Sequence, residues 1–484
     1  MDKINLISQT TSLVLVISIS LIFTFIGIVY SKKYKDLNNY LTANRNIGFF
    51  SLTTSLVASA LGAWILFGPA SAATWGGIGA VIGYALGTAF PMICLIFLGK
   101  KIRNEFPKGS TLIEFLRKRF GKSLFKLILL MTIFYMFVFL CAEVTAISIL
   151  INYISGTELW ITSLITLVST LIYTLYGGLR ASIITDTIQM VVILVLFVIS
   201  ISYLTSFTGN QFSFSFVNEK KAYLLSSSYV PNYTAGLTFF IAVAATNLFH
   251  QGNWQRVYAA KNNDVLKKSL IFAFFIIIPV VFFMGFCGLV ATSVDSNIRP
   301  DLGFFFLLLK DQAKFLSIII VILGLSLTIS TVDTLINAIS SLIVVDGKAT
   351  LNFHKNTNYL RISKYFIVCL SIIAFIIASK GFSILYLFLL ADLFCCAFVL
   401  TVFYSFYNKN IKERTAYFSI IFGLIGGFLL FPAPDFSKSL LVGIMLPLEL
   451  FPVFISQYLL FLSFLIATVG PGIVIMNYDS FKGR

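Results

Sequence analysis

The sequence predicts an all-α membrane protein with about 13 transmembrane helices. Only 11% of its 484 residues are charged and 58% are hydrophobic, whereas a soluble domain carries about 25% charged residues. Long stretches without Asp, Glu, Lys or Arg recur, for example 4–31 and 46–99, and about 20 apolar residues are enough to cross a bilayer. Together these observations exclude a single water-soluble core.

The expected spans follow the apolar runs in chain order. They cover residues 10–30, 48–73, 76–99, 124–150, 158–177, 181–205, 233–255, 269–291, 315–345, 364–379, 381–406, 415–431 and 451–476. With the N-terminus outside, 27 of the 35 Lys and Arg fall in inside segments and 8 in outside ones. Because positive loops stay cytoplasmic, we expect a multi-pass protein of the cell (inner) membrane with its C-terminus inside. This topology also accounts for the net charge of +16 without nucleic acid as a partner.

Helix breakers interrupt the second span at residues 59–69, which read SALGAWILFGP. Freed carbonyls at membrane depth are tolerated only where they face protein or a watery cavity, and secondary transporters coordinate sodium with such unwound backbone. A simple kink or close packing through small residues is the alternative. The seventh span is also unusual, because residues 244–256 are too polar for lipid contact. Interrupted segments five spans apart suggest inverted repeats with a site between them.

A polar stripe runs along the ninth span at helical spacing. It consists of Ser326, Ser330, Asp333, Thr334, Asn337, Ser340 and Ser341. The sixth span offers a matching set in Ser182, Thr185, Asp186 and Gln189. Hydroxyls, carbonyls and carboxylates are ligands for a hard cation, so the two stripes favour an ion site over hydrogen bonds that only hold helices together.

Two further carboxylates lie in apolar runs, Glu143 in the fourth span and Asp392 in the eleventh. They are either gating or substrate residues, or they are paired near an interface. No P-loop is present, which excludes primary ATP-driven transport. The six cysteines lack the spacing of a structural metal site. We therefore expect no enzyme.

Five motifs in order resemble the sodium/solute symporter family, which includes bacterial proline, pantothenate and sialic acid carriers and the sodium-glucose carriers. They are residues 39–48 (NYLTANRNIG), 111–121 (TLIEFLRKRFG), 176–181 (YGGLRA) followed by Thr185 and Asp186, 255–261 (QRVYAAK), and Ser330 and Thr331 with Ser340, Ser341 and Asp346. The resemblance covers nearly the whole chain and implies a LeuT-type five-plus-five inverted repeat. The implied parts are an extra helix with a cytoplasmic loop (1–47), a first repeat (48–206), a second repeat (207–406) and two C-terminal helices with a tail (407–484).

The resemblance also implies where sodium binds. Backbone carbonyls and hydroxyls would form the principal site, at Ala58, Leu61, Leu327, Ser330 and Thr331. A possible second cation site falls at Asp186, Asp333 and Thr334. Family members usually have two serines at the last two of these positions, and Asp333 departs from that pattern. Its carboxylate either strengthens cation binding or takes a proton and couples transport to pH.

The family's pocket positions fall on an aromatic set with few hydrogen-bonding groups. They are Trp64, Ile65, Phe67, Tyr84, Thr246, Asn247, His250 and Gln251. Such a pocket argues against a sugar and favours a small amino acid, a urea-like solute or an organic acid.

The function expected from these features is symport of a small organic solute by alternating access, with sodium as the coupling ion. Proton coupling through Asp186 and Asp333 is one alternative. A membrane sensor that transports nothing is another. The lipid bilayer and the solute are the expected partners, and no obligatory protein partner is evident.

Overall fold

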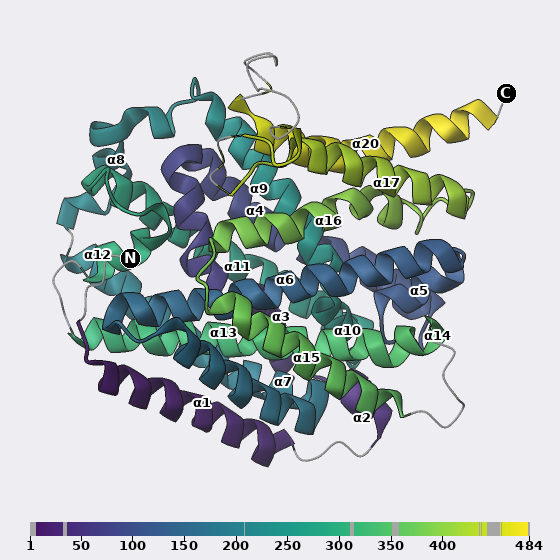
Figure 1. Cartoon of the computed structure of the whole chain (residues 1–484), viewed down its shortest axis with the longest axis horizontal. Coiled ribbons are helices and arrows are strands. Elements are labelled where there is room, and N and C mark those ends of the chain that lie inside the picture. The colour runs from purple at the N-terminus through teal and green to yellow at the C-terminus, as the bar shows by residue number, and fades with distance from the viewer. Residues whose placement is uncertain are drawn as a thin grey trace.

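The computed structural model is helical throughout, as the composition predicts. It describes residues 6–31, 36–207, 209–309, 314–350, 358–434, 436, 438–442, 455 and 457–482. Within these ranges the only β-type pairings are two isolated bridges, Ile47 with Ala260 and Pro432 with Ser439. Ten helices in the described residues are long and apolar enough to cross a membrane, so the protein is a multi-pass membrane protein (Figure 1).

The ten long helices are α1 (Gln9–Ser31), α4 (Gly68–Glu105), α6 (Lys122–Ser155), α7 (Leu159–Phe207), α11 (Asn263–Val294), α13 (Lys314–Leu342), α15 (Tyr359–Ala378), α16 (Ile384–Tyr404), α17 (Glu413–Leu430) and α20 (Leu459–Lys482). The other helices are α2 (Leu37–Thr42), η1 (Ala43–Arg45), α3 (Phe49–Ala60), η2 (Ala63–Leu66), α5 (Leu112–Arg119), η3 (Gly209–Gln211), α8 (Phe214–Lys221), η4 (Ala222–Leu225), α9 (Val230–Phe249), α10 (Gln251–Ala259), η5 (Pro300–Leu302), α12 (Gly303–Leu309), η6 (Ile343–Gly347) and α14 (Lys348–Thr350).

The predicted number of thirteen spans is not confirmed, because several predicted spans are not single long helices. Span 48–73 is divided among α3, η2 and the start of α4, and span 233–255 is divided between α9 and α10 at His250. Two pairs of predicted spans are joined within α4 and α7, each of which bends at a glycine with positive φ, Gly77 (φ 58°) and Gly178 (φ 63°). A straight helix of α7's 49 residues would measure about 70 Å, far beyond a bilayer core of about 30 Å.

Helix α13 is the most deeply buried of the long helices and contacts α6, α7 and α3. Helix α1 packs against α7 along one edge of the bundle, while α17 and α20 pack together along the opposite edge (Figure 1). The polar stripe of α13 therefore lies in the centre of the protein, away from lipid. Helices α3 and α10, which carry the two interrupted segments, both contact α13.

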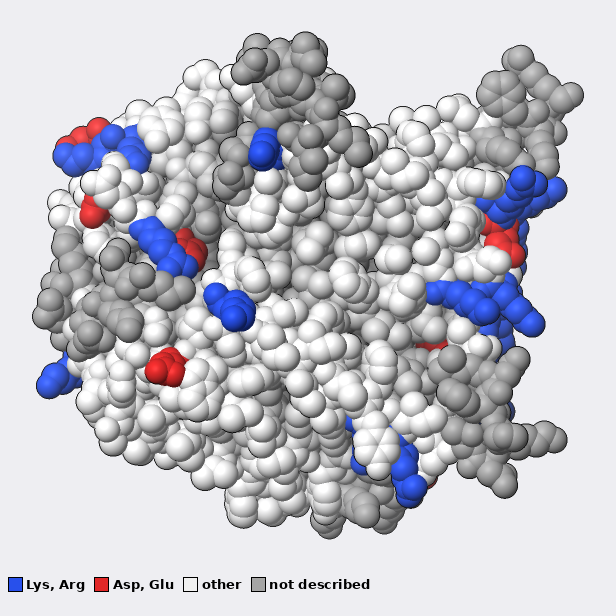
Figure 2. All heavy atoms as spheres, in the orientation of Figure 1, with Lys and Arg blue, Asp and Glu red and all other residues white. Residues whose placement is uncertain are grey.

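Charged side chains gather mainly near the two ends of the helix bundle, and the broad surface between those ends is largely uncharged (Figure 2). Large apolar side chains are exposed on the outer helices, for example Phe25 on α1 and Ile372 on α15. This distribution is typical of a protein whose helix ends face water and whose sides face hydrocarbon. The orientation of the two termini stays a prediction.

Candidate functional site

The break predicted in the second span is present. Helix α3 ends at Ala60, and Leu61 leaves helical geometry (φ −106°, ψ 83°). Gly62 is extended (φ −84°, ψ −179°), a short 3-10 turn follows, and α4 begins at Gly68. The segment is fully buried. Backbone groups that would pair with each other inside a continuous helix must therefore find other partners here, in the protein interior.

Two side-chain oxygens from other helices face this break. Glu143 on α6 accepts a hydrogen bond from the Ala63 amide through Oε2 (2.9 Å), and its Oε1 has no hydrogen-bond partner among the described residues. A Cβ added to Gly62 would overlap Glu143 Oε1 and would lie 2.8 Å from Thr331 Oγ1 on α13. The missing side chain of Gly62 thus lets a carboxylate oxygen and a hydroxyl approach the backbone at the break closely.

The structure brings the predicted sodium residues to one buried region. All five are buried, and the proximity of Gly62 to Thr331 sets the break against α13. The Thr331 hydroxyl donates to the Leu327 carbonyl (3.2 Å). The Ser330 hydroxyl points elsewhere and donates to Asp186 Oδ1 (2.5 Å). These residues remain a predicted site.

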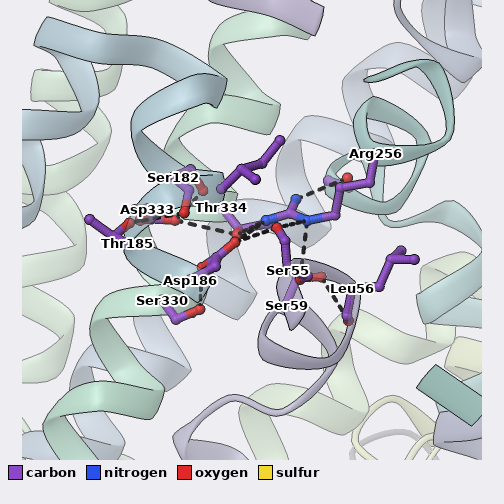
Figure 3. Close-up of polar contacts among 12 residues, drawn as sticks. Ser55, Leu56, Ser59, Ser182, Thr185, Asp186, Arg256, Ser330, Asp333 and Thr334 are labelled. Carbon is purple, nitrogen blue, oxygen red and sulfur yellow. Dashed lines mark hydrogen bonds and ion pairs between the residues drawn. The ribbon is translucent and has the colours of Figure 1, made fainter. Parts of the chain in front are cut away.

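A buried ion pair lies beside the break (Figure 3). Arg256 Nη2 is 2.6 Å from Asp186 Oδ2, and both side chains are fully buried. Ser55 on α3 donates to the same carboxylate oxygen (2.6 Å) and accepts from Arg256 Nε (2.7 Å). Arg256 Nη2 also donates to Thr334 Oγ1 (2.9 Å). Helices α3, α7, α10 and α13 are therefore joined by one charged network.

The second acidic residue, Asp333, has a different environment. Four hydroxyls donate to it, from Tyr173 (2.6 Å), Ser182 (2.6 Å), Thr185 (3.1 Å) and Thr334 (3.4 Å). No Lys, Arg or His in the described ranges forms an ion pair with it. The residues predicted for a second cation thus lie together, but of the two carboxylates only Asp186 has a basic partner in the described ranges.

Sequence reasoning missed Arg256 as a site residue. It appeared only as part of a family motif, although an arginine at the end of a polar segment inside the membrane requires an acidic partner. A search for an acidic partner of Arg256 among the carboxylates inside the membrane would have included Asp186. The structure shows that the two residues belong together.

A small closed cavity lies next to the 3-10 turn. Its lining residues are Trp64, Tyr84, Phe139, Val243, Thr246, Asn247, Phe388 and Asp392. Four of the eight predicted substrate residues are among them, namely Trp64, Tyr84, Thr246 and Asn247. Of the other lining residues, Asp392 was noted in the sequence without being assigned to the pocket.

The remaining four predicted substrate residues do not line this cavity. Ile65 is buried, and the ring of Phe67 packs on Phe305 at 5.1 Å between centroids. His250 lies behind Phe139, 6.2 Å between ring centroids. Gln251 instead binds the segment before α5, donating to the Ser110 carbonyl (3.1 Å).

Comparisons with known proteins identify the family of the chain. The family model of the sodium:solute symporter family matches residues 40–423, so the chain belongs to that family. It is 28% identical over 381 residues to the spermidine transporter DUR31 of Candida albicans, covering 78% of this chain and 71% of that protein. It is 23% identical over 457 residues to sodium/glucose cotransporter 4 of Mus musculus, covering 81% of this chain and 64% of that protein.

Among solved structures, the fold is similar to that of a Na+-coupled sialic acid symporter in a substrate-bound, outward-open state. The TM-score is 0.71 at 16% identity, over 97% of this chain and 98% of that one. The family and these relatives are transporters. The protein is therefore a membrane transporter of the symporter type, and no enzyme activity is assigned to it.

Proposed function

We propose that the protein is a secondary transporter that couples inward sodium movement to uptake of a small organic solute by alternating access. The observation that carries this proposal is the broken helix at Leu61 and Gly62, which lies against the Thr331 hydroxyl in the buried interior. Freed carbonyls and a hydroxyl are the ligands that sodium takes in transporters with broken helices. The membership of a sodium:solute symporter family supports the same coupling ion.

In this proposal sodium binds between the break and α13, at the residues predicted for the principal site. One sodium entering a negative interior contributes about 2.3 kcal/mol per 100 mV before any concentration gradient is added. The solute binds beside Trp64, in the 3-10 turn that follows Gly62, so the two ligands contact one interrupted segment of chain. The proposal includes thirteen spans with two inverted repeats, at 48–206 and 207–406, and a cell-membrane location with the N-terminus outside.

The solutes in the names of the relatives differ in charge. One is named a spermidine transporter and others are named sodium/glucose cotransporters. Spermidine is a polycation at neutral pH and glucose is uncharged. The comparisons therefore support a small organic solute and leave its charge to be decided from the cavity.

The experiment that tests sodium coupling is uptake into proteoliposomes with sodium and proton gradients imposed separately. Thr331→Val removes one proposed ligand, and we expect the sodium concentration for half-maximal uptake to rise at least tenfold, which is about 1.4 kcal/mol. The matched control is Thr328→Val, because Thr328 is an equally buried threonine of α13 with no hydrogen-bond partner among the described residues. An unchanged sodium dependence in Thr331→Val contradicts the site.

A second candidate is proton coupling, and Asp333 is the observation that favours it. This carboxylate is buried and accepts only neutral hydroxyl donors. A buried carboxylate without a basic partner is stable only when a cation or a proton accompanies it. Uptake that follows a pH gradient in the absence of sodium would favour this candidate.

A further inference from the structure

The cavity beside Trp64 contains a single charged group, the carboxylate of Asp392 on α16. The residue is only 5% exposed. Among the described residues its one hydrogen bond is with Thr246, whose hydroxyl donates to Oδ1 at 2.6 Å. Within the same ranges no Lys, Arg or His lines the cavity, and no basic residue forms an ion pair with Asp392. The carboxylate therefore lacks a positive partner in the part of the chain that the structure describes.

Aromatic rings form most of the remaining wall. The Trp64 indole stacks on Tyr84 with centroids 5.8 Å apart and meets the edge of Phe388 at 6.2 Å. Phe388 is in turn in edge contact with Phe139 at 4.5 Å. The faces of Trp and Tyr rings attract cations, and aromatic boxes of this kind bind alkylated ammonium groups. The aromatic wall and the Asp392 carboxylate thus both favour a positively charged ligand.

The cavity offers little to an uncharged polar solute. The Thr246 hydroxyl already donates to Asp392, and the side-chain amide of Asn247 donates to the Val243 carbonyl (3.0 Å). A sugar needs many hydrogen-bonding partners to offset its desolvation, and the lining residues offer few. An organic acid would place its own negative charge beside Asp392, which is costly in a low-dielectric site.

The free space is about 20 Å³, enough for roughly one water molecule. An ammonium group is of that size, whereas a whole solute is larger. The rest of the solute therefore requires the cavity to open, as alternating access demands.

We propose that this cavity binds the ammonium group of an organic amine, with Asp392 as its counter-ion and Trp64 and Phe388 as its cation-binding walls. Thr246 is a positioning residue that holds the carboxylate toward the cavity. This inference rests on the proposed function, for which it names the substrate class.

The test is thermal unfolding of the purified protein in sodium or potassium buffer, with charged ligands and neutral analogues of the same shape. The probes are choline against 3,3-dimethylbutan-1-ol, putrescine against butane-1,4-diol, and butyrate as the anion. We expect at least one amine to raise the unfolding midpoint and to bind at least tenfold more tightly than its neutral analogue. Equal effects of amine and analogue, a preference for butyrate, or no effect of any probe overturns the proposal.

Asp392→Asn keeps the shape of the side chain and should lower amine affinity at least tenfold without changing that of the neutral analogue. The matched control is Asp301→Asn, because Asp301 forms its ion pair with Arg299 away from the cavity. If Asp392→Asn does not fold, Trp64→Phe keeps a ring but weakens the cation contact, and a several-fold loss of amine affinity is expected. Unchanged amine affinity in a folded variant overturns the proposal.

The two proposals fail in different ways. If sodium alone stabilises the protein against a potassium control and no amine does, the amine proposal is wrong and sodium coupling stands. If an amine binds through Asp392 but its uptake ignores sodium, the amine proposal stands and sodium coupling is wrong.

Discussion

Replacing Gly62 with alanine tests whether sodium binds at the helix break, where Glu143 and Thr331 closely approach the Gly62 backbone. The added Cβ would overlap Glu143 Oε1 and would lie 2.8 Å from both Glu143 Cδ and Thr331 Oγ1. Since Cβ atoms essentially never approach other heavy atoms within 3.0 Å, both side chains or the backbone at Gly62 must move. Moving the Glu143 carboxylate breaks its hydrogen bond with the Ala63 amide.

The magnitude follows from these contacts. Overpacking a well-packed interior costs about 1–3 kcal/mol, and a hydrogen bond to a charged group contributes about 1.5–3 kcal/mol. The two costs overlap, so we expect Gly62→Ala to destabilise the protein by about 2–4 kcal/mol. The sodium-induced rise in unfolding midpoint should largely disappear, because the added methyl group displaces the oxygens of Glu143 and Thr331 that face the break.

The assay is thermal unfolding in matched sodium and potassium buffers, followed by sodium-dependent uptake at a temperature where the variant is folded. Gly48→Ala is the control, because Gly48 lies at the start of α3 with ordinary extended backbone (φ −79°) and no heavy atom within 4 Å of an added Cβ. It should behave as the wild type within about 1 kcal/mol. A folded Gly62→Ala variant with a wild-type response to sodium would refute the reasoning.

Two further predictions concern the charged network. Arg256→Ala leaves Asp186 buried without its partner, at an expected cost of about 3–5 kcal/mol, and adding Asp186→Asn should recover most of it. If the decreases in unfolding midpoint caused by Arg256→Ala and by Asp186→Asn simply add in the double variant, the pairing is contradicted. Asp333→Asn cannot carry a proton, so any uptake driven by an acidic exterior, which weakens as outside pH rises, should vanish while sodium-driven uptake remains. Proteoliposome uptake under imposed pH gradients measures this, and proton-driven uptake that persists in the variant would exclude Asp333.

Local chemistry made the helix break and the stripe on α13 predictable from the sequence. Gly62, Gly68 and Pro69 cannot continue a helix in a long apolar run without cost. Ser330 and Asp333 recur at helical spacing in a run that is otherwise aliphatic. Both features depend on residues within a few turns of one another, which is the range over which sequence patterns report structure.

The orientation of the pocket residues was only half predictable, because it depends on backbone angles at two breaks. His250 has φ −59° and ψ 106°, so α10 does not continue the faces of α9. Thr246 and Asn247, before the break, line the cavity, while Gln251, after it, binds the Ser110 carbonyl. Nothing in the residue types themselves specifies these angles.

The pairing of Arg256 with Asp186 joins positions 70 residues apart, and the pairing of Thr246 with Asp392 joins positions 146 residues apart. Periodicity carries no information on such contacts. The sequence does indicate that such contacts must exist, because each ionised group in a membrane interior requires a partner. A search for partners among the intramembrane charges would have reduced the choices for Arg256 to a few carboxylates.

That same requirement links the three regions of the interior. Arg256 neutralises Asp186, but Glu143 at the break, Asp333 on the stripe and Asp392 in the cavity have no basic partner in the described part of the chain. Burying three unmatched negative charges is unfavourable, so each favours a positive ligand: sodium at the break, an ammonium group in the cavity, and a proton or second cation at Asp333. The break connects Glu143 directly to Trp64, because Glu143 holds the first amide of the turn that carries the indole. A cation that draws Glu143 away from or toward that amide therefore changes the cavity wall, which gives a physical route by which one ligand senses the other.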